Sequence, residues 1–183
     1  MLEKEFLLIL IMEVLIVEKF DVYDSTGRKT GIVKEKGQIL EDGQYKMAVN
    51  AWFMNNNKLF VQKRTNNLRT APGMWSATSG GSISGEEPLD TVVRECKEEL
   101  GIDVATDKFI LLNKFIDKNY IIYVFIAHMD IDITSLTLQS SEVDAVDWKT
   151  LGEIERLILS GEFYCSVSGW KGVEVYTKLW SKI

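Results

Sequence analysis

One stretch near the middle of the chain carries hydrophobic residues at the spacing of an α-helix. It begins at Pro88, which suits the first helical position, and stops before Gly101, which suits the residue just past a helix end. At roughly 100° per residue, apolar side chains share one face of this helix. They are Leu89, Val92, Val93, Cys96 and Leu100. The pattern therefore predicts an amphipathic helix that packs against a core.

The chain around this helix alternates short apolar runs with turn residues, which predicts β-strands. The expected strands are Lys19–Asp24, Gly31–Gly37, Tyr45–Met54, Lys58–Arg64 and Trp75–Gly81 before the helix, and Lys108–Ile116, Tyr120–Asp130 and Glu142–Trp148 after it. Two more amphipathic helices are expected at Thr150–Ser160, with Thr150 as N-cap, and at Val173–Lys182. Strands on both sides of a helix, followed by further helices, predict an α/β fold with a mixed sheet covered by helices.

The first residues form the most unusual segment. Phe6–Val17 is strongly apolar, but it is shorter than the roughly 20 residues that cross a bilayer, and Glu13 interrupts it. A signal peptide is disfavoured, because acidic residues precede the segment and no small-residue cleavage site follows it. We expect a buried strand or helix, or a dimer contact. The sequence leaves open whether Met1 or Met12 is the native start.

Composition narrows the function classes. The chain of 183 residues, with 46% hydrophobic and 26% charged residues, suits one globular domain, and its net charge of −6 argues against nucleic-acid binding. One histidine leaves little material for a zinc site or a histidine-centred triad. The two cysteines do not form a disulfide framework, so a reducing cytoplasm is the expected location.

An acidic cluster lies beside the apolar face of the central helix. Glu95, Glu98 and Glu99 are spaced i, i+3 and i+4, so their charges repel one another by roughly 0.2–0.5 kcal/mol per pair. A hard divalent cation such as Mg²⁺ or Mn²⁺ would remove that penalty. The alternative is a solvated acidic face that is neutralised by Arg94 and Lys97.

The region 80–102 resembles the Nudix box, whose pattern is G-x5-E-x7-R-E-U-x-E-E-x-G-U with U an apolar residue. Every fixed position is met, from Gly80 and Glu86 through Arg94 to Gly101, with Cys96 as an unusual apolar choice. The flanks Gln62–Arg64 and Pro72–Trp75 most resemble the branch related to isopentenyl-diphosphate isomerase. The resemblance implies the Nudix fold, an α/β/α sandwich with a loop–helix–loop motif. Residues 1–183 would form one Nudix domain, with 1–18 as an apolar extension of open role.

The resemblance also implies a chemistry. Such enzymes cleave a diphosphate linkage in a nucleoside diphosphate derivative, or a related organic diphosphate, by water attack on phosphorus. Mg²⁺ or Mn²⁺ would be bound by the carboxylates of the cluster and by the carbonyl of Gly80. Arg94 would orient Glu95 or its neighbours by a bidentate pair, and Glu86 would contribute structurally or through a water molecule to the metal. The implied metal ligands are therefore Glu95, Glu98, Glu99 and Gly80.

Three further residues are candidates for catalysis or substrate binding. The general base would be a glutamate of the box or Glu142, with Asp144 behind it, although Glu142 could equally be a strand-edge charge. By the resemblance Arg64 would contact a substrate phosphate; the alternatives are that Lys63 does so, or that Arg64 forms only a surface salt bridge. Trp75 would stack on a base or fill the core beside the box helix. The expected catalytic residues are thus Glu98, Glu95, Arg94 and Glu142, and the expected substrate-binding residues are Arg64 and Trp75.

Two other functions were weighed against hydrolysis. An isomerase of isopentenyl diphosphate would use a cysteine just before the box and several histidines, but 76–82 has no cysteine and the chain has one histidine. A catalytically silent binding module would show a broken box, and this box is intact. Expected partners are a small-molecule diphosphate and a second copy in a homodimer, with no nucleic acid and no membrane. The substrate itself is not determined by the sequence.

Overall fold

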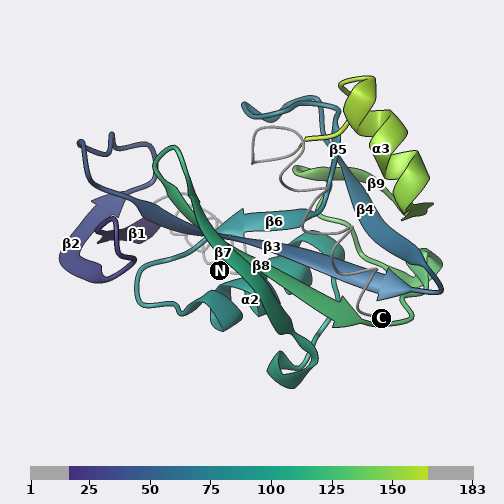
Figure 1. Ribbon diagram of the computed structural model, residues 1–183, viewed down its shortest axis with the longest axis horizontal. Helices are drawn as coiled ribbons and strands as arrows, with labels where there is room; N and C mark the ends of the chain where they lie inside the picture. Colours follow the sequence, from purple (N-terminus) through teal and green to yellow (C-terminus); the bar gives the residue numbers. More distant parts are fainter. Residues whose placement is uncertain (1–16, 165–183) are drawn as a thin grey trace, which may run out of the picture.

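A mixed seven-stranded β-sheet forms the centre of the structure, a computed structural model that describes residues 17–164 (Figure 1). Its main strand order is β5-β4-β3-β8-β7, with β6 also paired to β3 and β9 to β4. The strands are β3 (Lys46–Asn55), β4 (Lys58–Arg64), β5 (Trp75–Ser76), β6 (Thr78–Gly81), β7 (Ile110–Asp117), β8 (Tyr120–His128) and β9 (Val143–Thr150). Strand β8 runs parallel to β3 and the other pairs are antiparallel, which confirms the mixed sheet.

The sheet divides where β4 leaves β3. These strands pair only beside their turn, through Met54 with Leu59 and Asn55 with Lys58. Beyond that point β6 pairs with β3, while β5 pairs with β4. The predicted strand Trp75–Gly81 is therefore two short strands with Ala77 between them, because its two halves follow different partners. We call this division the fork.

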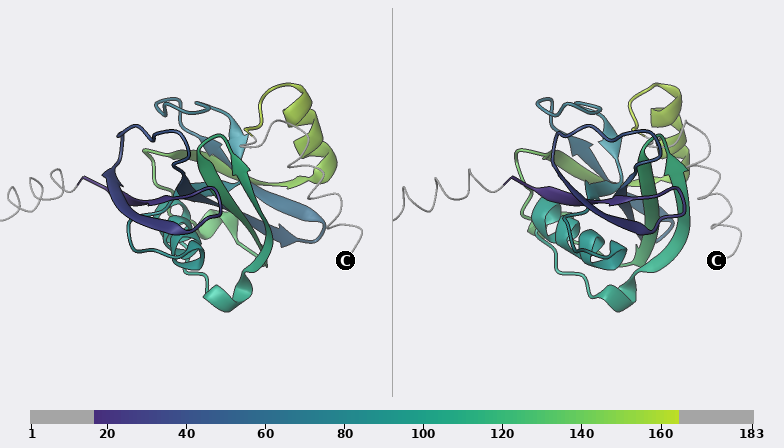
Figure 2. Two further views of the ribbon diagram at one scale, coloured as in Figure 1. Left: turned by 60° about the vertical axis from the view of Figure 1, so that its left-hand side comes forward. Right: turned by 90° about the vertical axis from the view of Figure 1, so that its left-hand side faces the viewer.

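Two helices cover opposite faces of the sheet, as Figures 1 and 2 show. Helix α2 (Pro88–Leu100) ends at Gly101, whose φ of 73° is the left-handed conformation that glycine adopts readily. Helix α3 (Leu151–Leu159) begins with a capping box between Thr150 and Glu153, as expected from the sequence. A helix on each face confirms the predicted layers. The segment Val173–Lys182 lies outside the described residues.

Each helix packs on a separate half of the core. Val92, Cys96 and Leu100 of α2 lie with one face of β3, and Ile154 of α3 lies with the other. Leu89 was expected to share the apolar face of α2, and this was wrong: the residue is 38% exposed. It lies in the first turn of the helix, and the buried residues of the helix begin after it, at Thr91 and Val92.

A two-stranded hairpin precedes the sheet and lies beside the start of α2 (Figure 2). It consists of β1 (Lys19–Tyr23) and β2 (Lys29–Glu35), as the turn residues between them predicted. Reciprocal backbone hydrogen bonds between Tyr23 and Tyr45 connect it to the segment that enters β3. Two short 3₁₀ helices, η1 (Thr106–Lys108) and η2 (Ile133–Ser135), complete the described elements. Among residues 17–164 no helix is long and apolar enough to span a membrane.

Candidate functional site

The carboxylate of Glu95 lies directly against the backbone of Gly80. Helix α2 packs along β6, and Glu95 points from the helix toward this strand and is buried. A Cβ atom at position 80 would lie 1.8 Å from the carboxyl carbon of Glu95, which no real pair of atoms tolerates. Glycine at position 80 therefore leaves the space that the carboxylate occupies.

Arg94 is the main cation of the site. Its guanidinium donates to both carboxylate oxygens of Glu86, at 2.7 and 3.2 Å, and to the carbonyl of Gly81 at 2.8 Å. One terminal nitrogen also lies 2.8 Å from carboxylate oxygens of Glu95 and Glu98. The bidentate partner is thus Glu86, while Glu95 and Glu98 each receive a single contact. One guanidinium is shared by three carboxylates, so the cluster keeps an excess of negative charge.

Glu99 is buried on the side of α2 that faces the fork. It is 1% exposed, and it accepts a hydrogen bond of 2.8 Å from the side-chain amide of Gln62. The carbonyl oxygen of that amide accepts a hydrogen bond of 3.0 Å from the hydroxyl of Thr78. Because Thr78 donates to the oxygen of Gln62, the nitrogen of the amide is directed toward Glu99. Within the part of the chain that the structure describes, a neutral chain of hydrogen bonds, and no ion pair, therefore orients this carboxylate.

Both buried carboxylates hold their protons more tightly than usual. Burial raises the pKa of Glu95 to about 7; the contacts with Arg94 oppose this, and the charges of Glu98 and Glu142 add to it. Burial likewise raises the pKa of Glu99 to about 8, against the hydrogen bond from Gln62, with Glu95 and Glu142 adding to the rise and Arg64 opposing it. The site therefore presents oxygen ligands whose charge the protein alone does not neutralise.

The charges of Glu142 and Arg64 influence the pKa values of the buried carboxylates, so these two residues belong to the same site. Glu142 comes just before β9, and its carbonyl accepts from the amide of Thr65 at 3.0 Å. Arg64 ends β4, and its Nε donates to the carbonyl of Thr70 at 3.1 Å. Of the residues expected from the sequence, the structure thus gathers Gly80, Arg94, Glu95, Glu98, Glu99, Glu142 and Arg64 around one end of the fork.

The side chain of Trp75 lies apart from the carboxylate cluster. Its ring packs with the core on the α3 face of the sheet, and the ammonium of Lys149 lies 4.7 Å from the ring centroid. The carboxylates of α2 belong to the opposite face. This position agrees with the interpretation of Trp75 as a core residue, and the structure does not bring it together with the other expected site residues.

The ligand chemistry of the cluster fits a hard divalent cation. Carboxylate and carbonyl oxygens are the ligands that Mg²⁺ and Mn²⁺ prefer, and they are what α2 and Gly80 offer. Within residues 17–164 no three His, Cys, Asp or Glu side chains are already arranged closely enough to enclose an ion. Glu98, whose side chain is 49% exposed, instead bonds to Arg94. The residues fit a metal by their donor atoms.

Comparison with known protein families agrees with this geometry. The model of the NUDIX domain matches residues 44–164, which include the fork, α2 and Glu142. The chain belongs to the Nudix family. This confirms the expected family, and the mixed sheet with a helix on each face is the Nudix fold.

Related sequences agree with this family assignment, and solved structures agree with the fold. Nudix hydrolase 3 of Arabidopsis thaliana is 34% identical over 147 residues, covering 72% of this chain but only 19% of that protein. An uncharacterised Nudix hydrolase of Listeria monocytogenes is 30% identical, covering 80% of this chain and 88% of its own. The crystal structure of DR0079 from Deinococcus radiodurans shares the fold, with a TM-score of 0.70, 18% identity, and coverage of 87% of this chain and 98% of that one. The prediction of a Nudix hydrolase is confirmed at the level of family and fold.

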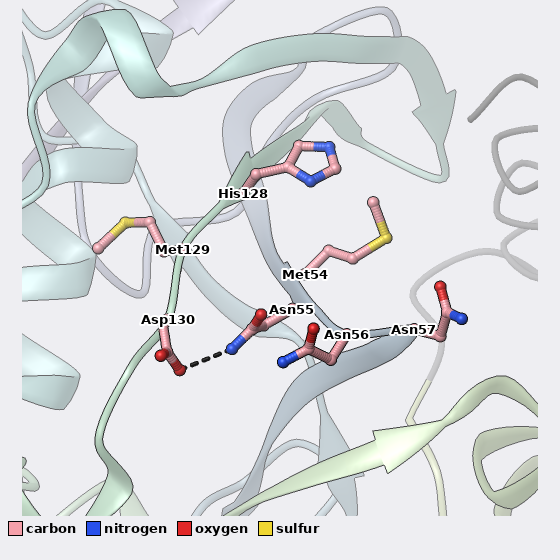
Figure 3. Close-up of a pocket in the computed structure, with 7 residues that line it drawn as sticks. All are labelled: Met54, Asn55, Asn56, Asn57, His128, Met129 and Asp130. Atoms are coloured by element: carbon pink, nitrogen blue, oxygen red, sulfur yellow. Dashed lines mark hydrogen bonds between the residues drawn. The ribbon is translucent and has the colours of Figure 1, made fainter.

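Isopentenyl-diphosphate isomerases are also related, as the flanks of the box suggested. The isomerase of Shigella dysenteriae is 24% identical over 140 residues, covering 73% of this chain and 77% of its own. Among residues 17–164, the cysteine and the histidine that such chemistry would use are not gathered at the carboxylate cluster. Cys96 is buried in the core, and His128 pairs with Met54 near the end of β3. There His128 lines a separate cavity of about 320 Å³ with Asn55 and Asp130 (Figure 3).

Some residues of the site were not predicted from the sequence. Gln62 and Thr78 orient Glu99, and Asp21 of the hairpin binds the loop before α2. A glutamine at an inward position of the apolar strand KLFVQKR was the only signal for Gln62. Asp21 gave no signal, because its partners in the loop before α2 lie more than sixty positions away.

Gly80→Ala should destabilise the protein, whereas the neighbouring Gly81→Ala should not. At position 80 the new methyl group collides with the carboxylate of Glu95, and at position 81 a Cβ meets nothing within 4 Å. Overpacking of this kind costs about 1–3 kcal/mol in the free energy of unfolding. Urea unfolding of the two variants measures the difference, and equal stabilities would contradict the placement of Glu95.

The metal-free protein should lose stability as the pH rises from about 5 to 8. The folded pKa values of Glu95 and Glu99 lie above the ordinary value of 4.5, so the folded state retains protons that the unfolded chain releases. This contribution is complete below the unfolded pKa and is lost as the pH rises through the folded pKa. The glutamine in Glu99→Gln does not ionise, so the stability of this variant should decline less steeply with pH. Glu155→Gln on α3 should show the same decline as the wild type. Urea unfolding in EDTA across this range measures both, and an equally steep decline in Glu99→Gln would count against the effect.

Proposed function

We propose that this protein is a metal-dependent Nudix hydrolase that cleaves the diphosphate linkage of a nucleoside diphosphate derivative or related organic diphosphate. The observation that carries the proposal is the pair of buried carboxylates, Glu95 and Glu99, with Glu98 and Glu142 nearby and too few cations to neutralise them. Such a group is unfavourable for stability alone. It is favourable where a divalent cation and a phosphate group bind together.

Glu95, Glu98 and Glu99, with the carbonyl of Gly80, would hold Mg²⁺ or Mn²⁺. When bound, the cation would neutralise charge on the non-bridging phosphate oxygens and acidify a water molecule. Arg94 keeps Glu95 and Glu98 on the same side of α2 through its contacts of 2.8 Å. Gln62, on β4, restricts the carboxylate of Glu99 through its hydrogen bond. These partners restrict the carboxylates before any ligand arrives, as the outer partners of metal ligands commonly do.

Arg64 would bind the substrate. It is half-buried at the end of β4, on the same side of the fork as Glu99, where it opposes the rise of that carboxyl pKa. A guanidinium is suited to phosphate oxygens because it offers several donors in one plane. Its hydrogen bond to Thr70 fixes the loop 65–74 beside the site. That loop would contribute to the choice of leaving group.

Glu142 would act as the general base. Its backbone is fixed at both sides, because its amide donates to Gln139 and its carbonyl accepts from Thr65. The amide of Gln139 in turn donates to the carbonyl of Glu99, so the loop carrying Glu142 is bound to the end of α2. A carboxylate held beside the metal ligands could accept the proton of the attacking water.

Turnover should require a divalent cation and Glu98. We would measure phosphate or nucleotide release from a panel of nucleoside diphosphate derivatives and isopentenyl diphosphate, with Mg²⁺, with Mn²⁺ or with EDTA. Glu98→Gln should lower kcat about 100-fold or more, since loss of a metal ligand removes several kcal/mol of transition-state stabilisation. Glu155→Gln, on the helix of the opposite face, should be unaffected. Isomerisation of isopentenyl diphosphate, or cation binding without turnover on any substrate, would contradict the hydrolase.

Glu142→Gln should separate catalysis from substrate binding. Because Glu142 would be the base, its loss should lower kcat by about 100-fold while KM stays within about twofold. Glu155→Gln, on the helix of the opposite face, is the control and should behave like the wild type. An unchanged kcat in Glu142→Gln would assign the base to a glutamate of the box or to Asp144.

A further inference from the structure

The N-terminal hairpin forms hydrogen bonds and an ion pair with the loop that leads into α2. This hairpin, formed by β1 and β2, lies outside residues 44–164, the part that the NUDIX domain model matches. The loop, residues 82–87, connects β6 to α2 and carries Glu86, the bidentate partner of Arg94. Whatever fixes this loop therefore also fixes the guanidinium that orients Glu95 and Glu98.

Asp21 makes the central contacts. Its carboxylate accepts from the hydroxyl of Ser84 at 2.6 Å and from the amide of Gly85 at 3.0 Å. The amide of Ser84 also donates to the carbonyl of Lys19 at 2.7 Å. Burial would raise the pKa of Asp21, but these hydrogen bonds and the ammonium of Lys29 outweigh it and lower the pKa. Asp21 is thus an anion that accepts hydrogen bonds from the loop, much as a capping residue accepts them from the first amides of a helix.

Lys29 connects the hairpin to the start of α2. Its ammonium lies 3.2 Å from Asp21 and 3.1 Å from the carboxylate of Glu87, the N-cap residue of the helix. It also donates to the carbonyl of Glu86 at 3.3 Å. The hairpin therefore contacts the residues on both sides of Glu86.

From Glu86 the connection continues into the site. The carboxylate of Glu86 accepts from the amide of Ile83, from the hydroxyl of Thr91 and from Arg94. Lys36, which follows β2, is also close to the site: its pKa is raised chiefly by Glu18, with Glu142 and Glu95 contributing. The hairpin is therefore within electrostatic reach of the carboxylates as well as hydrogen-bonded to their supporting loop.

We propose that Asp21 and Lys29 are positioning residues of this active site: they hold the loop 82–87 so that Glu86, acting through Arg94, keeps Glu95 and Glu98 in their metal-binding arrangement. The part concerning metal rests on the proposed function. The functional unit then begins at the hairpin, before the region matched by the family.

Asp21→Asn tests the proposal, with Asp24→Asn as its matched control. Asp24 lies in the same hairpin and also accepts hydrogen bonds, but all three come from Thr26 and Arg28 within its own turn. Asp21→Asn should weaken Mn²⁺ binding, followed by electron paramagnetic resonance, and lower kcat, each by about tenfold. It should also speed hydrogen exchange at the Gly85 amide by about tenfold. Asp24→Asn should change none of these by more than about twofold.

The NMR signal of the Arg94 Nε–H provides a readout that a merely structural role would not move. It should shift in Asp21→Asn, as the Glu86–Arg94 pair is disturbed, and stay in place in Asp24→Asn. Should Asp21→Asn fail to fold, Lys29→Gln replaces it, with the same expected directions. Mn²⁺ affinity and Gly85 exchange equal to the wild type in the folded variant would overturn the proposal.

The experiment separates this proposal from the proposed function. If the wild-type protein binds no Mn²⁺ and shows no turnover, the hydrolase proposal fails. Gly85 exchange and the Arg94 signal then still decide whether Asp21 positions the loop and its arginine. If the wild type binds Mn²⁺ and turns over but Asp21→Asn matches it, the positioning role alone is excluded.

Discussion

The burial of carboxylates between α2 and the sheet is the constraint on which the rest of the structure depends. A carboxylate taken out of water is stable only if hydrogen bonds or opposite charges replace the lost hydration. Glu95 has part of one guanidinium, and Glu99 has one amide. Neither is fully compensated, and the raised pKa values are the consequence. The protein keeps this unfavourable arrangement where a cation would relieve it.

The fork in the sheet is what allows the burial of Glu99. Where β4 and β3 part, the side chains of Gln62 and Thr78 lie between two strands that pair with different partners. Their hydrogen bond satisfies both groups and leaves the amide nitrogen of Gln62 for Glu99. The absence of a side chain at Gly80 plays the corresponding role for Glu95.

The arrangement is supported from outside as well as from the core. Arg94 depends on Glu86, and Glu86 belongs to a loop whose amides and carbonyl are bound by the hairpin. Helix α2 is thus fixed at its C-terminal end by Gly101 and the loop that carries Glu142, and at its N-terminal end by Asp21 and Lys29. A site that must hold several like charges together gains from support at both ends, because the charges themselves favour separation.

The sequence by itself determined the features that depend on local geometry. Pro88 and Gly101 set the ends of α2, alternation and turn residues set most strands, and the 3.6-residue period placed Glu95, Glu98 and Glu99 on one helix face. Only the tertiary structure decided which of these carboxylates is buried, that Glu86 is the bidentate partner of Arg94, and that Trp75 lies on the far face. It also revealed the contact of Gln62 with Glu99, 37 positions away, and the contacts of Asp21 with Ser84 and Gly85, 63 and 64 positions away. Such contacts follow from how strands and helices pack together, and no local spacing rule encodes them.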